Sequence, residues 1–158
     1  MHIKTICAGL FLTLGAACQI SGPSASGLKV QPITTANAFV ETYKSVCDAH
    51  VGSLPALRAE LTSRGYRPMG RDAVTTLYGL SNNQPTVSIG RGAKGTNICM
   101  VLAQNTSGFE AAVRDTITAQ SGYTYDGSFV AGPNSIGVTM NDTKPEGPIF
   151  GIAATPRN

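Results

Sequence analysis

A cysteine and a histidine at close spacing are the first residues of this chain that could carry chemistry. Cys47 and His50 stand three positions apart in the run Cys47-Asp48-Ala49-His50. Side chains three apart lie on one side of a helix, so the imidazole could hold the sulfur as a nucleophilic thiolate. The same sulfur could instead belong to a disulfide, with His50 a polar residue at a helix end. The spacing alone leaves both interpretations open.

Neither a metal ion nor another cofactor is expected. After His2, at the start of the chain, His50 is the only histidine, and no two cysteines show the Cys-x-x-Cys spacing of zinc sites. Asp126 and Asp142 lack the alternating carboxylates of a calcium loop. The glycine-rich run from Gly90 to Thr96 has its lysine before the last glycine, so it does not match a phosphate-binding loop.

Positive side chains gather in the middle of the chain and are the candidates for contact with an anion or a partner. They are Arg58, Arg64, Arg67, Arg71, Arg91 and Lys94. Lipid headgroups, lipopolysaccharide phosphates or an acidic protein would suit them, whereas a solvated helix face and loop is the plainer interpretation. The formal net charge of the whole chain, +3, is too small to indicate nucleic acid.

An N-terminal helix is predicted to position Cys47. Its apolar residues recur at helical spacing and form one stripe: Phe39, Val40, Tyr43, Val46 and Cys47. The segment Thr86–Ala103 alternates apolar and polar residues on either side of a glycine-punctuated turn, which predicts a β-hairpin. Because Cys99 lies on the second strand of that hairpin, we expect a Cys47–Cys99 disulfide that fastens the helix to the centre of a sheet.

The remaining patterns predict an α+β fold in the order helix-helix-strand-strand-strand-helix-strand-strand. A mixed or antiparallel sheet of about five strands would pack against about three helices. Ser53 and Ser107 are the expected N-caps of the second and third helices, the latter in a capping box with Glu110. The segment 66–72 reads as a loop or a ragged edge strand, and 122–134 as a loop.

The first residues resemble a secretory signal, with His2 and Lys4 ahead of an uncharged, mostly apolar run. The run ends in Leu14-Gly15-Ala16-Ala17-Cys18, which resembles a bacterial lipobox. The resemblance implies that Cys18 is diacylated and anchors the chain to a membrane. Ordinary cleavage after Ala17, or near residues 24–26, is the alternative. Lipidation of Cys18, or cleavage beyond it, leaves one clean cysteine pair.

These observations divide the chain into a signal peptide at 1–17, a flexible tether at 18–35 and one α+β domain at 36–158. The favoured function is that of an exported envelope (lipo)protein, periplasmic or anchored to the outer membrane. It would be a non-enzymatic binding or accessory module of unknown ligand. A secreted inhibitor acting through an exposed loop, Gly90–Gly95 or Gly122–Asn134, is one alternative. A thiol-dependent enzyme using Cys47 and His50 is the other.

Overall fold

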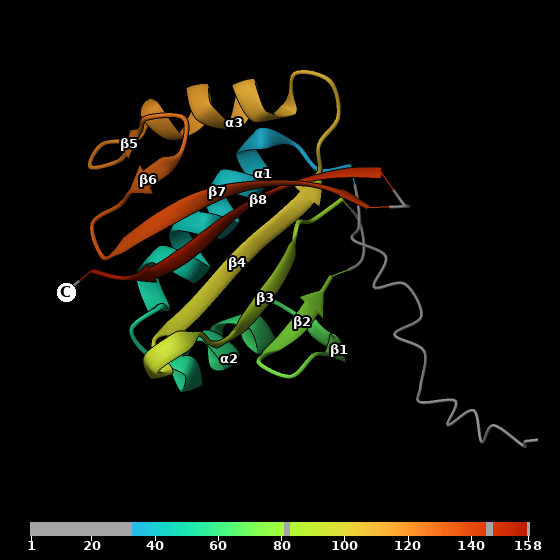
Figure 1. Ribbon diagram of the computed structural model, residues 1–158, viewed down its shortest axis with the longest axis vertical. Helices are drawn as coiled ribbons and strands as arrows, with labels where there is room; N and C mark the ends of the chain where they lie inside the picture. The colour runs from blue at the N-terminus through green and yellow to red at the C-terminus, as the bar shows by residue number, and fades with distance from the viewer. Residues whose placement is uncertain (1–32, 81–82, 145–146, 158) are drawn as a thin grey trace, which may run out of the picture.

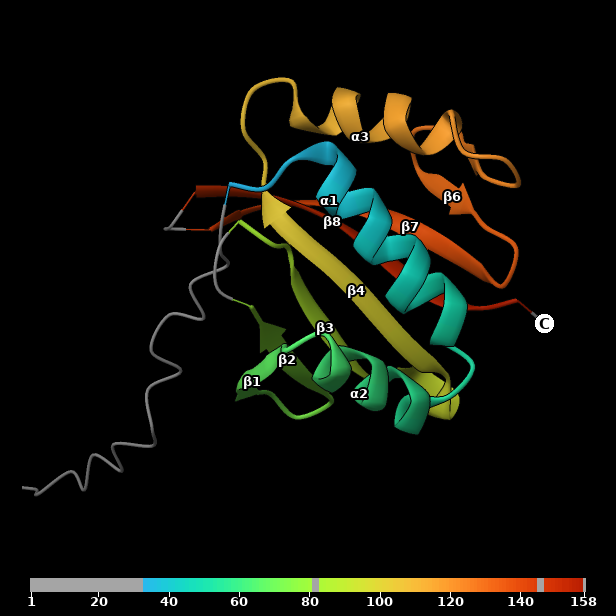
Figure 2. The ribbon, with the colours of Figure 1, turned by 180° about the vertical axis from the view of Figure 1, so that it is seen from behind.

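One eight-stranded antiparallel sheet, covered by helices on one side only, forms the body of the protein (Figures 1 and 2). The computed structural model describes residues 33–80, 83–144 and 147–157. The expected signal peptide, Cys18 and most of the expected tether lie outside these residues. Thr34 is buried and the Thr35 side chain caps the first helix. Residues 34 and 35, at the end of the expected tether, thus contact the folded body.

Helical segments both precede and interrupt the strands. The elements before the long central strand are α1 (Ala36–Thr42), the π-helix η1 (Tyr43–Asp48), α2 (Leu54–Ser63), β1 (Arg67–Arg71), β2 (Thr75–Gly79), β3 (Thr86–Arg91) and the short 3-10 turn η2 (Ala93–Gly95). Those that follow are β4 (Asn97–Gln104), α3 (Phe109–Thr118), β5 (Thr124–Tyr125), β6 (Phe129–Ala131), β7 (Ser135–Lys144) and β8 (Gly147–Pro156). The strand order across the sheet is β1-β2-β3-β4-β8-β7-β6-β5.

The α+β class is confirmed, but the expected number of strands is too low, since the sheet has eight rather than about five. The segment 66–72 supplies β1, an edge strand, and the supposed loop 122–134 contains β5 and β6. These last two strands have two and three residues. Strands that short cannot show an alternating pattern, so only the pairing of β6 with β7 and of β5 with β6 reveals them.

The stapled N-terminal helix is confirmed. Cys47 forms a disulfide with Cys99, and the Cα atoms of the pair lie 5.3 Å apart. All five residues of the apolar stripe are fully buried. The helix does not stay α-helical, because Tyr43–Asp48 is wound as a π-helix. Four of these six residues are buried, so the wider turn presents more side chains to the sheet than an α-helical turn would.

The two expected caps have different outcomes. Ser53 does cap α2, its hydroxyl accepting a hydrogen bond from the amide of Ala56. Ser107 does not cap α3, since the N-cap is Gly108 at φ 79° and has no side-chain bond. The amide of Phe109 instead donates to the carbonyl of Thr106, and this turn needs the left-handed glycine that delays the helix by one residue.

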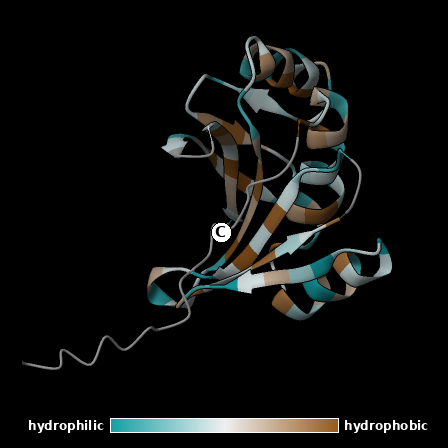
Figure 3. Ribbon diagram, turned by 90° about the vertical axis from the view of Figure 1, so that its right-hand side faces the viewer, coloured by the Kyte–Doolittle hydropathy of each residue, from teal (hydrophilic) through white to brown (hydrophobic). Residues whose placement is uncertain are grey.

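Three aromatic rings form the upper part of the core, where α1, α3 and β8 meet. The ring centroid of Phe39 lies 5.6 Å from those of Phe109 and Phe150. The Phe109 and Phe150 centroids are 6.1 Å apart in an edge-to-face arrangement. Seen from the side, hydrophobic segments recur along the strands beside the helices (Figure 3). Phe39 lies on α1 and Cys47 on the following η1, so aromatic packing and a covalent bond hold this helical segment at two points along its length.

Removing the disulfide should lower the stability of the fold strongly. The bond closes a loop with a sequence separation of 52 residues. In the chain-entropy model, opening such a loop in the unfolded state costs roughly 4 kcal/mol of unfolding free energy. Urea unfolding should therefore show this loss in the Cys47→Ala/Cys99→Ala variant. Reductant should bring the wild-type protein to the same level, and a wild-type midpoint indifferent to reductant would contradict the expectation.

Candidate functional site

The face of the sheet that points away from the helices carries a group of apolar side chains. Along β4, Cys99, Val101 and Ala103 are fully buried towards the helices. Met100 and Leu102 alternate with them and therefore point to the opposite side, where they are half-buried. In the view of Figure 1 the helices α1 and α2 lie behind the sheet, and none of the helices that the structure describes stands in front of it.

One continuous row of side chains crosses this side of the sheet. Phe129 on β6 is paired with Val138 on β7, and Val138 with Ala153 on β8. Ala153 is paired in turn with Met100 on β4. Phe129 and Val138 are 50% and 45% exposed. Residues directly opposite one another on paired strands share a face, so these four side chains are neighbours.

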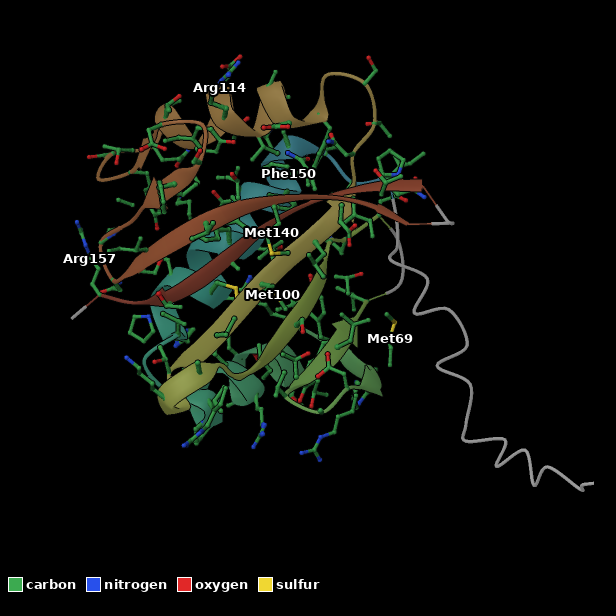
Figure 4. The ribbon with its side chains drawn as sticks, viewed as in Figure 1. Met69, Met100, Arg114, Met140, Phe150 and Arg157 are labelled. Carbon is green, nitrogen blue, oxygen red and sulfur yellow. A yellow bond between two sulfur atoms is a disulfide. The ribbon has the colours of Figure 1, made fainter. Side chains whose placement is uncertain are left out.

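A second group of side chains widens the row along β7. Ile136 is 42% exposed, and Met140 lies two residues beyond Val138 on the same face. A Cβ atom at Gly151 would lie 2.6 Å from Cδ2 of Leu102 and 3.4 Å from Cε of Met140, so these two side chains meet above that glycine. Figure 4 shows Met100 and Met140 side by side on the viewer's side of the sheet.

We call this surface the open face. It consists of Met100, Leu102, Phe129, Ile136, Val138, Met140 and Ala153. None of these residues can carry a charge. The uncovered side of an antiparallel sheet usually carries polar residues, and a contiguous exposed apolar patch marks an interaction site. The arrangement suits noncovalent binding, and flexible methionine side chains allow it to adapt to the shape of what it binds.

The structure does not bring Cys47 and His50 together as a catalytic pair. The Cys47 sulfur is bonded to Cys99 and is fully buried, so in the disulfide form it carries no thiolate. Nε2 of His50 lies 4.0 Å from a carboxylate oxygen of Glu60. The other oxygen of Glu60 accepts a 2.6 Å bond from Arg64. His50 therefore faces an ion pair at the surface of α2 rather than a nucleophile.

The six basic candidates are divided among three settings. Arg64 is paired with Glu60 on its own helix. Lys94 lies at the tip of the β3–β4 connection with φ 60°, and Arg67 begins the edge strand β1; both side chains are exposed. The other three line one pocket: Arg58, Arg71 and Arg91. Cys18 lies outside the described residues.

A buried carboxylate is the main feature that the sequence did not indicate. Asp48 is 3% exposed and has hydrogen-bond donors on both oxygens. Oδ1 accepts from the Ser135 hydroxyl at 2.7 Å and from the Asn134 amide at 3.2 Å. Oδ2 accepts from the Tyr123 hydroxyl at 3.0 Å and from the Asn134 side chain at 3.4 Å. These partners are 75 to 87 residues away along the chain, so no local motif announces them.

The tyrosines around Asp48 stay protonated. Burial raises the pKa of Tyr43 to about 12, and the Tyr43 hydroxyl meets that of Ser135 at 3.0 Å. Burial, together with the hydrogen bond to the Asp48 carboxylate, also raises the pKa of Tyr123. A Cβ atom at Gly132 would lie 2.4 Å from Oδ1 of Asp48, which leaves no room beside the carboxylate. The cluster is closed and fully hydrogen-bonded, and it acts as a structural link between η1 and the turn before β7.

Replacing Asp48 by asparagine should destabilise the protein without changing its shape much. The amide would place a donor against groups that already donate, and a buried unsatisfied group costs about 1–3 kcal/mol. Asp115→Asn is the matched control, because the Asp115 side chain is 78% exposed. Denaturant unfolding should show a clear loss of stability for Asp48→Asn only. Equal stability of the two variants would show that the Asp48 cluster contributes little.

Two further findings concern only the parts of the chain that the structure describes. No three His, Cys, Asp or Glu side chains are placed to hold a metal ion there. None of the helices there has the length and apolar character needed to cross a bilayer. Comparison of the chain with protein-family models, with curated proteins and with solved structures gives no match.

Proposed function

We propose that this protein is a non-catalytic binding module of the bacterial envelope, held at a membrane through Cys18. In this role the open face binds an apolar surface of another envelope protein. The observation that carries the proposal is the row Phe129, Val138, Ala153 and Met100, which crosses four strands without a covering layer. The Cys47–Cys99 disulfide supports an oxidising compartment outside the cytoplasm.

Burial of the open face against a partner would contribute favourable free energy to binding. Phe129, Ile136 and Val138 are between 42% and 50% exposed. Full burial of a large apolar side chain is worth about 1.5–3 kcal/mol, so covering the remaining half of each contributes roughly 1 kcal/mol. The methionines and Leu102 add to this sum. Since association itself has a substantial entropic cost, a moderate, reversible affinity follows rather than a permanent complex.

The chemistry of the open face limits the kind of partner that it accepts. A charged group brought against its centre would lose water without gaining a counter-charge, and such burial is strongly unfavourable. The strands beneath are already paired on both sides, so their backbone cannot take up an added strand there. The partner must therefore pack its side chains flat against the sheet, as the second layer of a sandwich or a helix would.

An inhibitory role would use part of the same surface. The loop considered for that role, Gly122–Asn134, contains β5 and β6. Its exposed aromatic side chain, Phe129, belongs to the open face. Inhibition would then be one outcome of partner binding at the β6 side of the sheet, rather than a separate activity carried by a wedge-shaped loop.

A photo-crosslinking side chain at Val138 tests the proposed binding face. Placed in the native host, p-benzoylphenylalanine at position 138 should give one dominant crosslinked protein. The same group at Arg114, a half-exposed position on the outer side of α3, is the control and should not (Figure 4). A second variant, Phe129→Glu, should abolish the crosslink from position 138. Equal products from positions 138 and 114 would contradict the proposal, and a crosslink only to a second copy would replace it with self-association.

Membrane attachment has its own test in the mass of the mature protein. Acylation at Cys18 should give a chain that begins at that residue and carries a diacylglycerol-sized increment. Two cysteines should react with an alkylating agent only after reduction, since Cys47 and Cys99 form the disulfide. A mature chain that begins elsewhere and carries no lipid would remove the membrane anchor from the proposal and leave the open face unaffected.

A further inference from the structure

A pocket opens on the helical side of the sheet, at the end farthest from α3. Its volume is about 290 Å³, and it lies between α2 and the ends of β1 and β3. Three arginines line it, together with apolar and small residues. The full lining is Leu54, Arg58, Arg71, Ala73, Val74, Thr76, Ile89, Gly90 and Arg91. We call it the arginine pocket.

Three separate elements bring these arginines together. Arg58 lies in the second turn of α2, Arg71 is the last residue of β1 and Arg91 is the last residue of β3. The Arg91 amide donates to the carbonyl of Val74, which draws the end of β3 against the β1–β2 turn. Only glycine permits that approach at position 90, because a Cβ atom there would lie 2.1 Å from the Val74 carbonyl oxygen.

A carboxylate shapes the β1–β2 turn, and it forms none of the ion pairs found among the described residues. Oδ1 of Asp72 accepts from the amides of Val74 at 2.8 Å and Thr75 at 2.6 Å. Oδ2 accepts from the Thr75 hydroxyl at 2.8 Å. These hydrogen bonds lower the pKa of Asp72, so it stays ionised as a turn-forming group. Both oxygens of Asp72 therefore accept hydrogen bonds from the turn itself.

The guanidinium groups of the arginine pocket have no partner among the residues that the structure describes. The ion pairs found there are Lys44–Glu41, His50–Glu60, Arg64–Glu60 and Arg114–Asp115. None of them includes Arg58, Arg71 or Arg91. Three like charges around one hollow repel each other, so an anion placed between them would be favoured.

The part of the chain that forms the arginine pocket has a net positive charge, like the pocket itself. Residues 54–97 contain six Lys and Arg but two Asp and Glu, a difference of +4. Residues 98–158 contain three Lys and Arg against five Asp and Glu, a difference of −2. The positive charge of these two segments is therefore concentrated in the first of them, which forms the arginine pocket. Such a positive region draws anions towards the pocket.

From these observations we infer that the arginine pocket binds a phosphate monoester group with a small organic substituent. Guanidinium groups pair bidentately with phosphate oxygens, and three of them carry more than enough positive charge to offset a phosphate dianion. Thr76 adds a hydroxyl, while Leu54 and Ile89 offer an apolar wall for the carbon substituent. A volume of about 290 Å³ is at the lower limit of ligand pockets, which fits a headgroup rather than a nucleotide.

The site is independent of the proposed function. Ile89 is paired with Cys99, whose side chain points to the helices, so the arginine pocket and the open face lie on opposite sides of the sheet. Phe129→Glu, which should abolish partner binding, should leave phosphate binding unchanged. The proposal of partner binding at the open face and the proposal of phosphate binding in the arginine pocket can therefore fail independently.

Calorimetric titration of the mature protein at low ionic strength tests the inference. The probes are inorganic phosphate, glycerol 1-phosphate and dihexanoyl phosphatidic acid below its micellar concentration, with dihexanoyl phosphatidylcholine as the zwitterionic control. We expect saturable binding of at least one of the first three and none of the last. Each of Arg58→Gln, Arg71→Gln and Arg91→Gln should weaken that binding about 10-fold, the loss expected for one charge-assisted hydrogen bond.

The matched control is Arg67→Gln, which removes the same charge from the same end of the protein but not from the arginine pocket. It should change the affinity less than about twofold. Tighter binding of the short-chain lipid than of glycerol 1-phosphate would identify a lipid headgroup, and the reverse a soluble phosphate ester. The inference fails if no probe saturates, or if Arg67→Gln weakens binding as much as the pocket variants, because binding would then be diffuse. Urea unfolding of each variant establishes that the fold is intact.

Discussion

The structure depends on how the π-helix η1 is held against the sheet by two consecutive residues. Cys47 is bonded covalently to the central strand β4, and Asp48 accepts hydrogen bonds from the segment that leads into β7. The two links run to opposite halves of the sheet, since β4 and β7 are separated by β8. One short helical segment thereby fixes the position of strands that are distant in sequence, and α1 and α2, which continue from it, must stay on that side.

This constraint explains why the second side of the sheet is left without helices. The helices α1 and α2 connect to η1, and α3 packs against α1, so none of these three reaches across to the open face (Figure 2). The central strands nonetheless carry apolar side chains on both sides, with Met100 and Leu102 opposite the buried Cys99 and Val101. Gly151 lets Leu102 and Met140 meet above β8 and close the surface into one patch. Among the described residues, the buried hydrophobic cluster does not include these side chains, and their exposure is the feature that the proposed partner binding would explain.

The sequence revealed those features that depend on local periodicity. The stripe from Phe39 to Cys47 and the alternation around Cys99 were enough to predict the helix, the hairpin and the disulfide that joins them. Features that depend on distant residues were missed. The Asp48 cluster joins residues 75 to 87 positions apart, and β5 and β6 are too short to show a pattern. The basic residues were visible as a run, but only the fold separates Arg64, paired with Glu60, from the three that share a pocket.

The two proposed binding surfaces obey different physical rules, and this difference bears on how they would work together. Binding at the open face would depend on the removal of apolar area from water. Salts such as sulfate strengthen this effect. The arginine pocket depends on charge in an exposed setting, where ionic strength screens it. Because the surfaces lie on opposite sides of one sheet, neither ligand obstructs the other. Under the two proposals, a membrane-attached module would hold a phosphate group through its positive end while its open face stays available to a protein. Salt would then release the first contact and leave the second in place.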